Sequence, residues 1–424
     1  MRIHWFSPLP HAPTDIADYT RRLLPALCSR ANVTVWTNQE RWSYRLKFLA
    51  EVRRFDPHAL PRELHDGAVF YNIGNNSQFH SAIWETARRI PGFAIMHDVF
   101  MHDSLAHSYQ IGQDRSGYLQ TMQALYGPRG RRDGELYWDG ALAMPQIGRR
   151  YTCAPYLLHG SLGAIVHSRM AARALRHEAG LPVFELPLPF PARRKPAPHT
   201  GPPPWRLIVF GYLGSNRCLE QTLTALAGLP GREAFHLHIY GKLENPAPVA
   251  ALIERLQLQD LVTVHGFVPT MQLERALAAA HLAINLRFPT KGEASGSQLR
   301  IWSHALPSLI SRIGWYAELP EDTAVFVRPN HLVEDLRAHL AGYTTAPQRY
   351  LDAGRAGHRY FVERHSPENY AAAIVELAGR AAEYRRQANA ALLADRAAGA
   401  LAGWFDPARL PSYTDRLAAL TGEM

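Results

Sequence analysis

The sequence "LPLPFPARRKPAPHTGPPPW", residues 186–205, divides a chain of 424 residues into two halves. It contains eight prolines. Proline has a fixed φ and no backbone N–H, so this segment can be neither a helix nor a central strand. We interpret it as a linker between two domains, because a single hydrophobic core rarely serves more than about 250–300 residues.

The same pattern of elements recurs on both sides of this linker. Short apolar runs, each followed by a turn and a helical pattern, lie at 2–6, 32–37, 68–73, 93–97 and 163–168, and again at 205–211, 235–241, 261–266, 281–286, 307–311 and 324–329. Strands that alternate with helices indicate a parallel, doubly wound sheet. We predict two Rossmann-like domains, at 1–188 and 205–380, joined by the linker 189–204 and followed by C-terminal helices at 381–424 that could pack back on the first domain.

The composition indicates an anionic partner. The formal net charge is +9 and the pI is about 9.5, which fits nucleic acid, an acidic membrane surface or phosphate-bearing small molecules. The chain has neither zinc-finger spacing nor an RNA-recognition signature, which argues against nucleic acid. Cys28, Cys153 and Cys218 are too scattered for a disulfide framework or a zinc site.

Hydropathy points to a cytoplasmic protein. No run of about 18 uncharged apolar residues is present, and the first residues, "MRIHWFSPLPH", lack the apolar segment of a signal peptide. The segment "RWSYRLKFLAEVRRF", residues 41–55, mixes apolar side chains with five basic ones. It is either a helix with its apolar side on the core or a peripheral contact with an anionic membrane.

The residues that follow the strands are the candidates for a binding site, because ligands of open parallel sheets lie beyond the carboxyl ends of the strands. Two such edges that face each other would form an interdomain cleft. The candidates are Asn75, Asn76, His97 and Asp98 in the first half, and Gly211, Gly214, Lys242, Gly266, Phe267 and Arg287 in the second.

The segment "RFPTKGEASGSQLR", residues 287–300, joins a strand to a helix. Ser295, Gly296 and Ser297 would lie at the helix N-terminus, where small residues leave N–H groups open to an anion such as a diphosphate. A carboxylate there would repel phosphate, so Glu293 fits better as a partner for sugar hydroxyls. The alternative is that Glu293 caps the helix.

A second phosphate candidate is "FGYLGSNRCLEQTL", residues 210–223. Its glycines would let the backbone approach a ligand, and Arg217 at the helix entry could neutralise charge on a departing diphosphate. The alternative is an ordinary glycine turn before a helix.

The stretch "MHDVFMHDS", residues 96–104, contains four potential metal ligands, His97, Asp98, His102 and Asp103. They would form a site only if their side chains converged. We favour His97 reaching a substrate hydroxyl and the aspartates capping the next helix, and we predict no metal site. Asn75 and Asn76 either bind sugar hydroxyls or accommodate a left-handed turn.

The ordered series of motifs resembles a known family. "FSPLPHAPTDIADYTRRLLPAL", "YNIGNN", "MHD", "IVHS", "FGYLGSNRCLEQTLTAL", "VTVHGFVP", "LRFPTKGEASGSQLR" and "SRIGWYAELPED" together resemble the bacterial retaining glycosyltransferases of family 4, which have the GT-B fold. The resemblance covers residues 1–375. It implies a nucleotide-diphosphate sugar held by the second domain and an acceptor held mainly by the first.

The resemblance also assigns roles by position. Glu293 matches the first glutamate of the family's Glu, seven residues, Glu motif, Arg217 a basic residue on the diphosphate, and His97 a residue near the reaction centre. Acceptor contacts would fall on Asp15, Asn75, Asn76 and Asp98, and further donor contacts on Gly211, Gly214, Lys242, Gly266, Phe267, Arg287, Lys291, Ser295, Gly296 and Ser297.

The chain departs from the family pattern at three positions. The second glutamate would fall at Ile301, Tyr212 stands where an arginine is common, and Asp15 stands where a glycine is common. Arg287, Lys291 or Arg300 could supply the second positive charge.

We therefore predict a retaining, metal-independent glycosyltransferase without a cofactor, whose partners are a nucleotide sugar and a hydroxyl acceptor that is a glycan, lipid-linked or other. Two alternatives stay open. A GT-B sugar-nucleotide epimerase would convert the donor without an acceptor, and a non-catalytic subunit of a glycosyltransferase complex would have lost donor binding.

Overall fold

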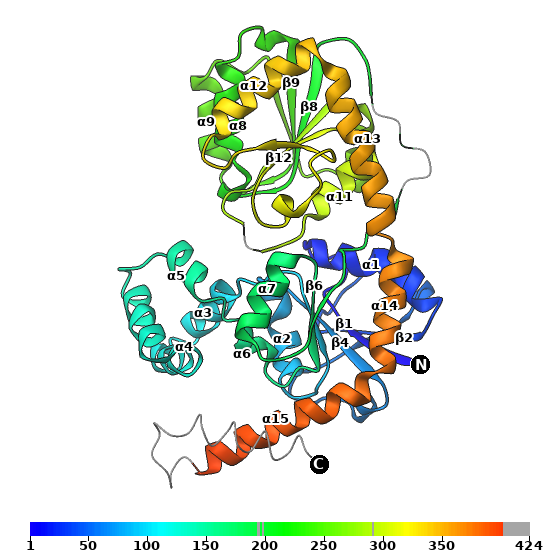
Figure 1. Ribbon diagram of the computed structural model, residues 1–424, viewed down its shortest axis with the longest axis vertical. Helices are drawn as coiled ribbons and strands as arrows, with labels where there is room; N and C mark the ends of the chain where they lie inside the picture. The colour runs from blue at the N-terminus through cyan, green and yellow to red at the C-terminus, as the bar shows by residue number, and fades with distance from the viewer. Residues whose placement is uncertain (193–195, 197–198, 291, 402–424) are drawn as a thin grey trace. The chain divides into compact units, whose positions relative to one another are not determined.

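The protein consists of two compact α/β units (Figure 1). The computed structural model describes residues 1–192, 196, 199–290 and 292–401, so Lys291 and the part of the predicted 381–424 segment beyond 401 lie outside the described residues. Unit 1 comprises Met1–Pro187 together with the chain from Pro367 onward, and unit 2 comprises Leu188–Ser366. The second unit therefore ends before the predicted boundary at 380.

Unit 1 is built on a seven-stranded sheet in the order β3-β2-β1-β4-β5-β6-β7. Every neighbouring pair is parallel. The five central strands coincide with the apolar runs of the sequence, and the two edge strands, β3 and β7, were not predicted. The strands are β1 (Arg2–Phe6), β2 (Asn32–Thr37), β3 (Glu51–Arg54), β4 (Ala68–Ile73), β5 (Phe93–Met96), β6 (Gly163–Val166) and β7 (Val183–Glu185).

Helices connect these strands as the alternation predicted, with one large addition. Between β5 and β6 the chain forms four helices, α3 to α6, and Figure 1 shows α3, α4 and α5 beside the sheet. The helices of this half are α1 (Asp15–Cys28), α2 (Ser77–Ala87), α3 (His102–Ile111), α4 (Arg115–Trp138), α5 (Met144–Arg150), α6 (Ala154–Leu158) and α7 (Arg169–Glu178), with short 3-10 turns η1 (Tyr44–Phe48) and η2 (Arg62–His65).

The interpretation of residues 41–55 as one helix is wrong. The segment forms η1 and then the edge strand β3. Arg53 of β3 makes ion pairs with Glu51 and Glu63, which satisfy polar side chains on the exposed edge. In η1 only Leu46 is buried, whereas Tyr44 is 66% and Phe48 is 80% exposed.

Unit 2 is built on a six-stranded parallel sheet in the order β10-β9-β8-β11-β12-β13. All six strands match predicted runs: β8 (Trp205–Leu213), β9 (Phe235–Leu243), β10 (Val262–Gly266), β11 (Leu282–Asn285), β12 (Ser308–Ser311) and β13 (Val325–Val327). The remaining elements are η3 (Ser215–Arg217), α8 (Leu219–Ala227), η4 (Arg232–Ala234), α9 (Pro246–Arg255), α10 (Thr270–Ala279), α11 (Gly296–Ser303), η5 (Gly314–Glu318), α12 (Leu332–Thr345) and α13 (Pro347–Arg364).

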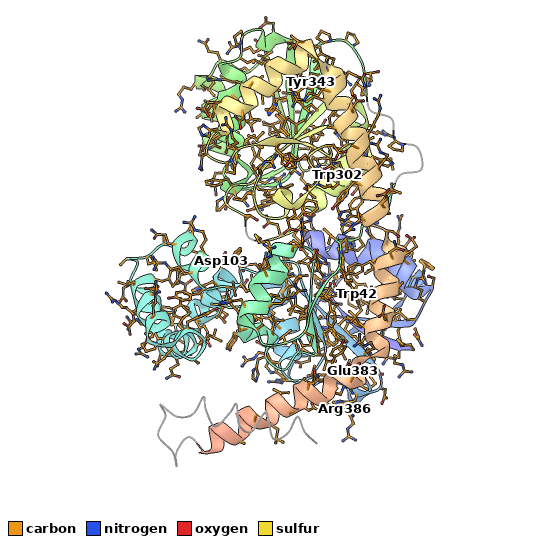
Figure 2. All side chains as sticks on the ribbon, viewed as in Figure 1. Trp42, Asp103, Trp302, Tyr343, Glu383 and Arg386 are labelled. Atoms are coloured by element: carbon orange, nitrogen blue, oxygen red, sulfur yellow. The ribbon has the colours of Figure 1, made fainter. Side chains whose placement is uncertain are left out.

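Packing fixes the position of α11 within unit 2. Trp302 is fully buried, and its indole N–H donates to the carbonyl of Thr323 at 2.9 Å (Figure 2). Ile301 is also fully buried and packs in a small core with Ile208 and Phe210 of β8. One face of α11 is therefore held against the sheet, which leaves its first residues at the carboxyl edge.

The last described helices, α14 (Pro367–Gly379) and α15 (Ala381–Leu401), belong to unit 1. Tyr370 of α14 packs edge-on against Tyr19 of α1, with ring centroids 6.1 Å apart. Arg385 of α15 donates from Nη2 to the carbonyl of Gly67 at 3.2 Å. Among the described helices none is both long and apolar enough to span a membrane.

Candidate functional site

The candidate site in unit 2 lies where β8 and β11 are neighbours. On either side of this pair the strand order runs in opposite directions, which is the point where open α/β sheets bind ligands, beyond the carboxyl ends of the strands. Gly211 lies near the end of β8 and has a φ of 113°, which only glycine adopts readily, and β11 ends with Asn285.

The N-terminus of α11 is open at this point. The Ser295 hydroxyl caps the helix by accepting from the backbone N–H of Gln298 at 3.1 Å. A Cβ added to Gly296 would meet no atom within 4 Å, and one added to Gly211 would lie 3.8 Å from Ser297 Oγ. The predicted residues Gly211, Ser295, Gly296 and Ser297 therefore come together around helix N–H groups that favour an anion.

Arg217 is buried beside this helix, with 4% of its surface exposed. Its Nη2 donates to the carbonyl of Phe210 at 3.1 Å and to Asn285 Oδ1 at 3.0 Å. Asn285 in turn donates from Nδ2 to Gln298 Oε1 at 2.9 Å, and Gln298 Nε2 donates to Ser308 Oγ at 2.8 Å. The network joins β8, β11, α11 and β12, so the positive charge of Arg217 is held rigidly.

Arg287 provides a second positive charge nearby. Burial raises the pKa of the Cys218 thiol to about 11, and the charges of Arg217 and Arg287 act in the opposite direction. Both guanidinium groups are thus close enough to Cys218 to influence its ionisation. Arg287 follows β11, and its guanidinium lies beside Glu293 in the loop that leads to α11.

Glu293 does not cap α11, because Ser295 does. One carboxylate oxygen of Glu293 accepts from the Thr290 hydroxyl at 3.2 Å, and the other lies 3.5 Å from Arg287 Nε. Both charged side chains remain partly exposed. The loop between β11 and α11 thus presents a carboxylate beside a guanidinium.

The other predicted donor residues line the same sheet edge farther from α11. Gly214 lies between β8 and η3, and Lys242 is exposed on β9 opposite Tyr212. Gly266 ends β10, at the far edge of the sheet, and Phe267, which follows it, is 86% exposed. The structure does not bring Gly266 and Phe267 to the pair of strands β8 and β11.

In unit 1 most of the predicted acceptor residues make hydrogen bonds that stabilise the loops in which they lie. The backbone N–H of Asn75 donates to Asp98 Oδ2 at 2.8 Å, and Asn75 Oδ1 accepts from the N–H of Ser104 at 3.1 Å. Asn76 caps α2 by accepting from the N–H of Gln78. Asp15 is exposed in the first turn of α1.

His97 ends β5 among aromatic rings. Its ring lies 4.7 Å from that of Tyr19 and 5.1 Å from that of His167. Burial, followed by the neighbouring His167 and His80, lowers the pKa of His97 well below its ordinary value. The imidazole is therefore neutral near pH 7.

The hydrogen bonds around His97 fix its tautomer. Asn72 Nδ2 donates to the carbonyl of Phe6 at 2.9 Å, so Asn72 Oδ1 is the acceptor that faces His97 Nε2 at 3.0 Å. The ring proton of His97 is thus on Nε2, and Nδ1 has the lone pair. A neutral imidazole in this state can accept a hydrogen bond from a hydroxyl.

The four potential metal ligands of residues 97–103 do not converge. Both ring nitrogens of His102 are engaged, Nδ1 with the carbonyl of Tyr151 at 3.1 Å and Nε2 with the Tyr118 hydroxyl at 2.7 Å. Asp98 faces Asn75 instead. Within the described part of the chain, no group of three or more His, Cys, Asp or Glu residues is placed to hold a metal ion.

Sequence reasoning missed three polar residues that organise these sites. Asn285 and Gln298 anchor Arg217 and α11, and Asn72 orients His97. Asn72 and Asn285 are both buried polar residues near the carboxyl end of an otherwise apolar strand. An asparagine in such a run is the signal that could have identified them, because a buried amide requires partners.

Comparisons with known proteins agree with this architecture. No protein-family model and no curated protein matches the chain. Among solved structures, HepE from Anabaena, in complex with UDP and glucose, has a TM-score of 0.62 at 13% identity, covering 89% of this chain and 99% of its own. A sucrose-phosphate synthase from Thermosynechococcus elongatus has a TM-score of 0.60 at 14% identity, covering 89% and 98%.

A glycosyltransferase from Rickettsia africae has a TM-score of 0.56 at 12% identity, covering 90% of this chain and 98% of its own. At such identities the likeness concerns the fold. The predicted GT-B fold is thereby confirmed.

Proposed function

We propose that this protein is a retaining glycosyltransferase that moves a sugar from a nucleotide-diphosphate sugar to an acceptor hydroxyl. The observation that supports this function is the site at β8 and β11, where the open N-terminus of α11 lies against Gly211 and beside the buried Arg217. The fold is shared with HepE, whose structure contains UDP and glucose.

The proposed role of unit 2 is to hold the donor and stabilise the leaving group. When the bond between the anomeric carbon and the diphosphate oxygen breaks, negative charge develops on the diphosphate. The N–H groups of α11, Arg217 and Arg287 would meet that charge, and each preorganised donor of this kind is worth about 2–4 kcal/mol. The Glu293 carboxylate would accept hydrogen bonds from hydroxyls of the transferred sugar.

The proposed role of unit 1 is to hold the acceptor, with His97 accepting a hydrogen bond from a substrate hydroxyl. The acceptor oxygen would attack on the same face that the diphosphate leaves, and a phosphate oxygen of the leaving group would take the hydroxyl proton. The anomeric configuration would then be retained. We propose that the reaction needs neither a metal ion nor a cofactor, since Arg217 and α11 supply positive charge at the phosphates.

We propose that the acceptor is a glycan or a lipid-linked or other hydroxyl compound used in cell-surface polysaccharide or glycoconjugate synthesis, in the cytoplasm or on the inner face of the membrane. η1 supports a membrane contact, because the exposed Tyr44 and Phe48 alternate with the exposed basic residues Arg45 and Lys47. Such a segment suits an anionic bilayer surface. Phe48→Ser should weaken sedimentation with phosphatidylglycerol vesicles, and equal sedimentation would contradict the contact.

A panel of nucleotide sugars tests the function. A donor that binds should raise the melting temperature in proportion to RT ln(1 + [L]/Kd). With the donor so identified, NMR of the product formed with acceptor should show the donor's anomeric configuration. Conversion of the donor sugar without acceptor would instead indicate an epimerase. Absence of binding across the panel would indicate a non-catalytic subunit, which the burial of Ile301 at the second glutamate position would suit.

A further inference from the structure

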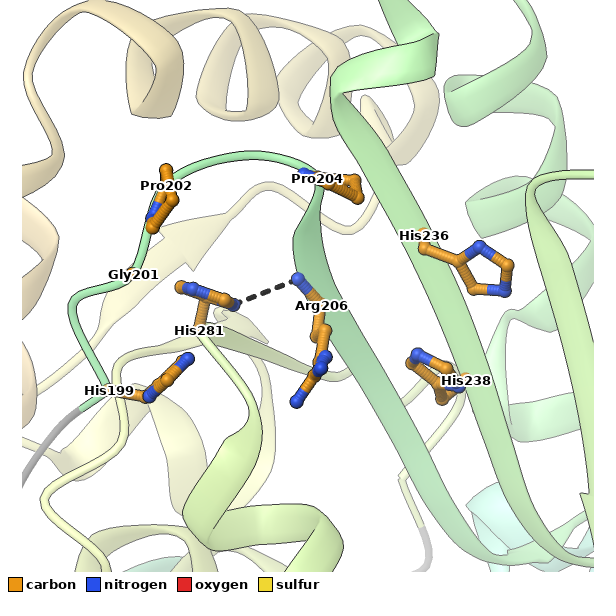
Figure 3. A pocket seen from close by; sticks show the side chains of 8 residues that line it. All are labelled: His199, Gly201, Pro202, Pro204, Arg206, His236, His238 and His281. Atoms are coloured by element: carbon orange, nitrogen blue, oxygen red, sulfur yellow. Dashed lines mark hydrogen bonds between the residues drawn. The ribbon is translucent and has the colours of Figure 1, made fainter.

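A second group of polar side chains lies at the other edge of the sheet of unit 2, where the strands begin. Arg206 is the second residue of β8, His236 and His238 lie in the first half of β9, and His281 directly precedes β11. With residues of the segment before β8 they line a cavity of about 450 Å³ (Figure 3). We call this the histidine pocket; its lining residues are His199, Gly201, Pro202, Pro204, Arg206, His236, His238 and His281.

His281 carries a buried donor toward this pocket. It is only 2% exposed, and its Nδ1 accepts from the backbone N–H of Arg206 at 2.9 Å, which places the ring proton on Nε2. Within the described residues this Nε2 makes no complete hydrogen bond, although the backbone of Gly201 is close enough to favour the charged ring. The Gly201 backbone gives this donor a neighbouring acceptor of imperfect geometry, and a negative charge beside the ring would stabilise its protonated form.

The groups that surround the pocket are all basic. Burial, followed by His236, His265 and Arg206, lowers the pKa of His238 to about 4. Burial likewise lowers the pKa of His281 to about 4, followed by His199 and Arg206. No Asp or Glu is among the lining residues in the described part of the chain.

Aromatic contacts bring the histidines together. The rings of His199 and His281 are 4.4 Å apart, and those of His236 and His238 are 4.7 Å apart. In Figure 3 the Arg206 side chain extends between His199 and His238. His238 Nδ1 and His265 Nε2 are hydrogen-bonded to each other at 3.0 Å, and His236 Nε2 is 2.8 Å from Thr263 Oγ1, so these nitrogens are already partnered.

We propose that the histidine pocket binds a small oxyanion of the phosphate class, either as the free ion or as a phosphate monoester. A tetrahedral anion would accept from the Arg206 guanidinium and would provide, beside the His281 ring, the negative charge that the lining lacks. The rings of Pro202 and Pro204 form an apolar wall, and the volume exceeds what the bare ion needs, which leaves room for the organic part of a monoester.

The site is distinct from the proposed donor site, because it lies at the amino ends of the strands whereas α11 begins at their carboxyl ends. A metal ion fits it less well. Arg206 repels cations, and no group of three ligands is available among the described residues.

The binding should strengthen as the pH falls. An anion favours the protonated form of the surrounding histidines, so binding takes up protons. The groups that face the pocket from each element are Arg206 of β8, His236 and His238 of β9, His265 of β10, His281 before β11 and His199 of the preceding segment.

The experiment titrates the full chain with three probes: sulfate, inorganic phosphate and glycerol 3-phosphate. The readouts are calorimetry and the ¹H–¹⁵N imidazole signals of His281 and His238. Sulfate is a dianion throughout this range, so its pH dependence reports the protein alone. Because the pKa values of His238 and His281 are about 4, we expect sulfate to bind more tightly at about pH 5 than at about pH 8 and to shift both signals. Tighter binding of glycerol 3-phosphate than of inorganic phosphate would identify a site for phosphate monoesters. Tighter binding of inorganic phosphate would identify a site for the free ion.

Two variants locate the binding. Arg206→Gln keeps the backbone donor to His281 and should weaken binding of all three probes by about tenfold or more. The matched control is Arg255→Gln, an exposed arginine of the same unit that does not line the pocket. The proposal would be overturned if none of the three probes bound saturably, or if Arg206→Gln bound them as tightly as the wild type. It would also be overturned if only Arg217→Met weakened their binding.

Discussion

The structure distinguishes the two roles considered for Glu293, capping α11 and binding the donor sugar. The helix-capping alternative is excluded because Ser295 caps α11, while Glu293 contacts Thr290 and Arg287 in the preceding loop. An ion pair that is partly exposed contributes about 0–1 kcal/mol, so removing the charge should hardly change stability. A charge-assisted hydrogen bond to the donor sugar is worth about 1.5–3 kcal/mol.

Glu293→Gln should therefore lower kcat/KM on the order of 100-fold while the melting temperature stays nearly unchanged. Steady-state kinetics and thermal unfolding of the same preparation provide both quantities. Glu254→Gln, in which an exposed glutamate of α9 loses its charge, serves as the matched control. Transfer by Glu293→Gln at the wild-type rate would show that the carboxylate is structural.

Arg217 is expected to act through its charge as well as its hydrogen bonds. Arg217→Met should lower kcat/KM by at least about tenfold and destabilise unit 2 by about 1–3 kcal/mol, because Asn285 Oδ1 and the carbonyl of Phe210 lose a donor. Arg217→Lys retains the charge and should keep more activity than the methionine variant. Equal activity of the two variants at equal folded fraction would contradict a role of the charge.

At the scale of elements, the carboxyl ends of β4, β5 and β6 collect histidines that are held neutral. Burial lowers the pKa values of His80 and His167 to about 4. The unfolded chain binds protons on these rings below about pH 6.5 while the folded chain does not, so stability is complete above that pH and declines as the pH falls toward the folded pKa values.

Between about pH 7 and about pH 5, each of these histidines should cost the fold about 2 kcal/mol. Denaturant unfolding at the two pH values measures the loss. His80→Gln should flatten the dependence, whereas His11→Gln, which changes an exposed histidine of the same unit, should leave it as in the wild type. Identical pH dependence in all three proteins would contradict the burial argument.

The strands that the sequence predicts are those with continuous apolar runs, such as Ala68–Ile73, which are buried on both faces. The edge strand Glu51–Arg54 has the sequence "EVRR", and aromatic residues precede and follow it in the sequence. The mixture of apolar and basic residues therefore resembles an amphipathic helix. Only the sheet register, which pairs Val35 with Val52, distinguishes the two. The pairing partner is distant in sequence, and local periodicity cannot reveal it.

The location of the candidate site could be predicted from the sequence, but the side-chain network within it could not. Strand ends and small residues indicate where Gly211 and Ser295–Ser297 meet, because topology alone places them at one edge. The burial of Arg217 was not predictable, since it depends on Asn285 and Gln298 from other elements. Side-chain networks of this kind depend on tertiary packing, which a local motif does not encode.

At the scale of the whole molecule, the absence of a metal requirement is testable. Prolonged treatment with EDTA should leave sugar transfer largely intact, because Arg217, Arg287 and the N-terminus of α11 supply positive charge at the proposed phosphate position. Initial rates before and after chelation provide the measurement. Complete loss of transfer that a single divalent ion restores would contradict the proposal.

Unit 1 is discontinuous in sequence, so fragments of the two units should differ in their ability to fold. A fragment of residues 188–366 contains every element of unit 2 and should unfold cooperatively, whereas 1–187 alone lacks α14 and α15 and should aggregate or remain partly unfolded. Tyr19 and Phe93 would lose their contacts with Tyr370 and Tyr384. Circular dichroism and denaturant titration of both fragments provide the test. Cooperative unfolding of the fragment 1–187 would contradict the expectation.

The same discontinuity sets the order of events on the ribosome. Residues 188–366 emerge complete while the first 187 residues still await α14 and α15, so the half synthesised second can finish folding first. Until residues 367–401 leave the exit tunnel, the surfaces of α1 and of β5 that they cover stay open to chaperones. A nascent chain stalled with residues 367–401 still inside the exit tunnel would then carry one finished half and one unfinished half, because α14 and α15 belong to unit 1.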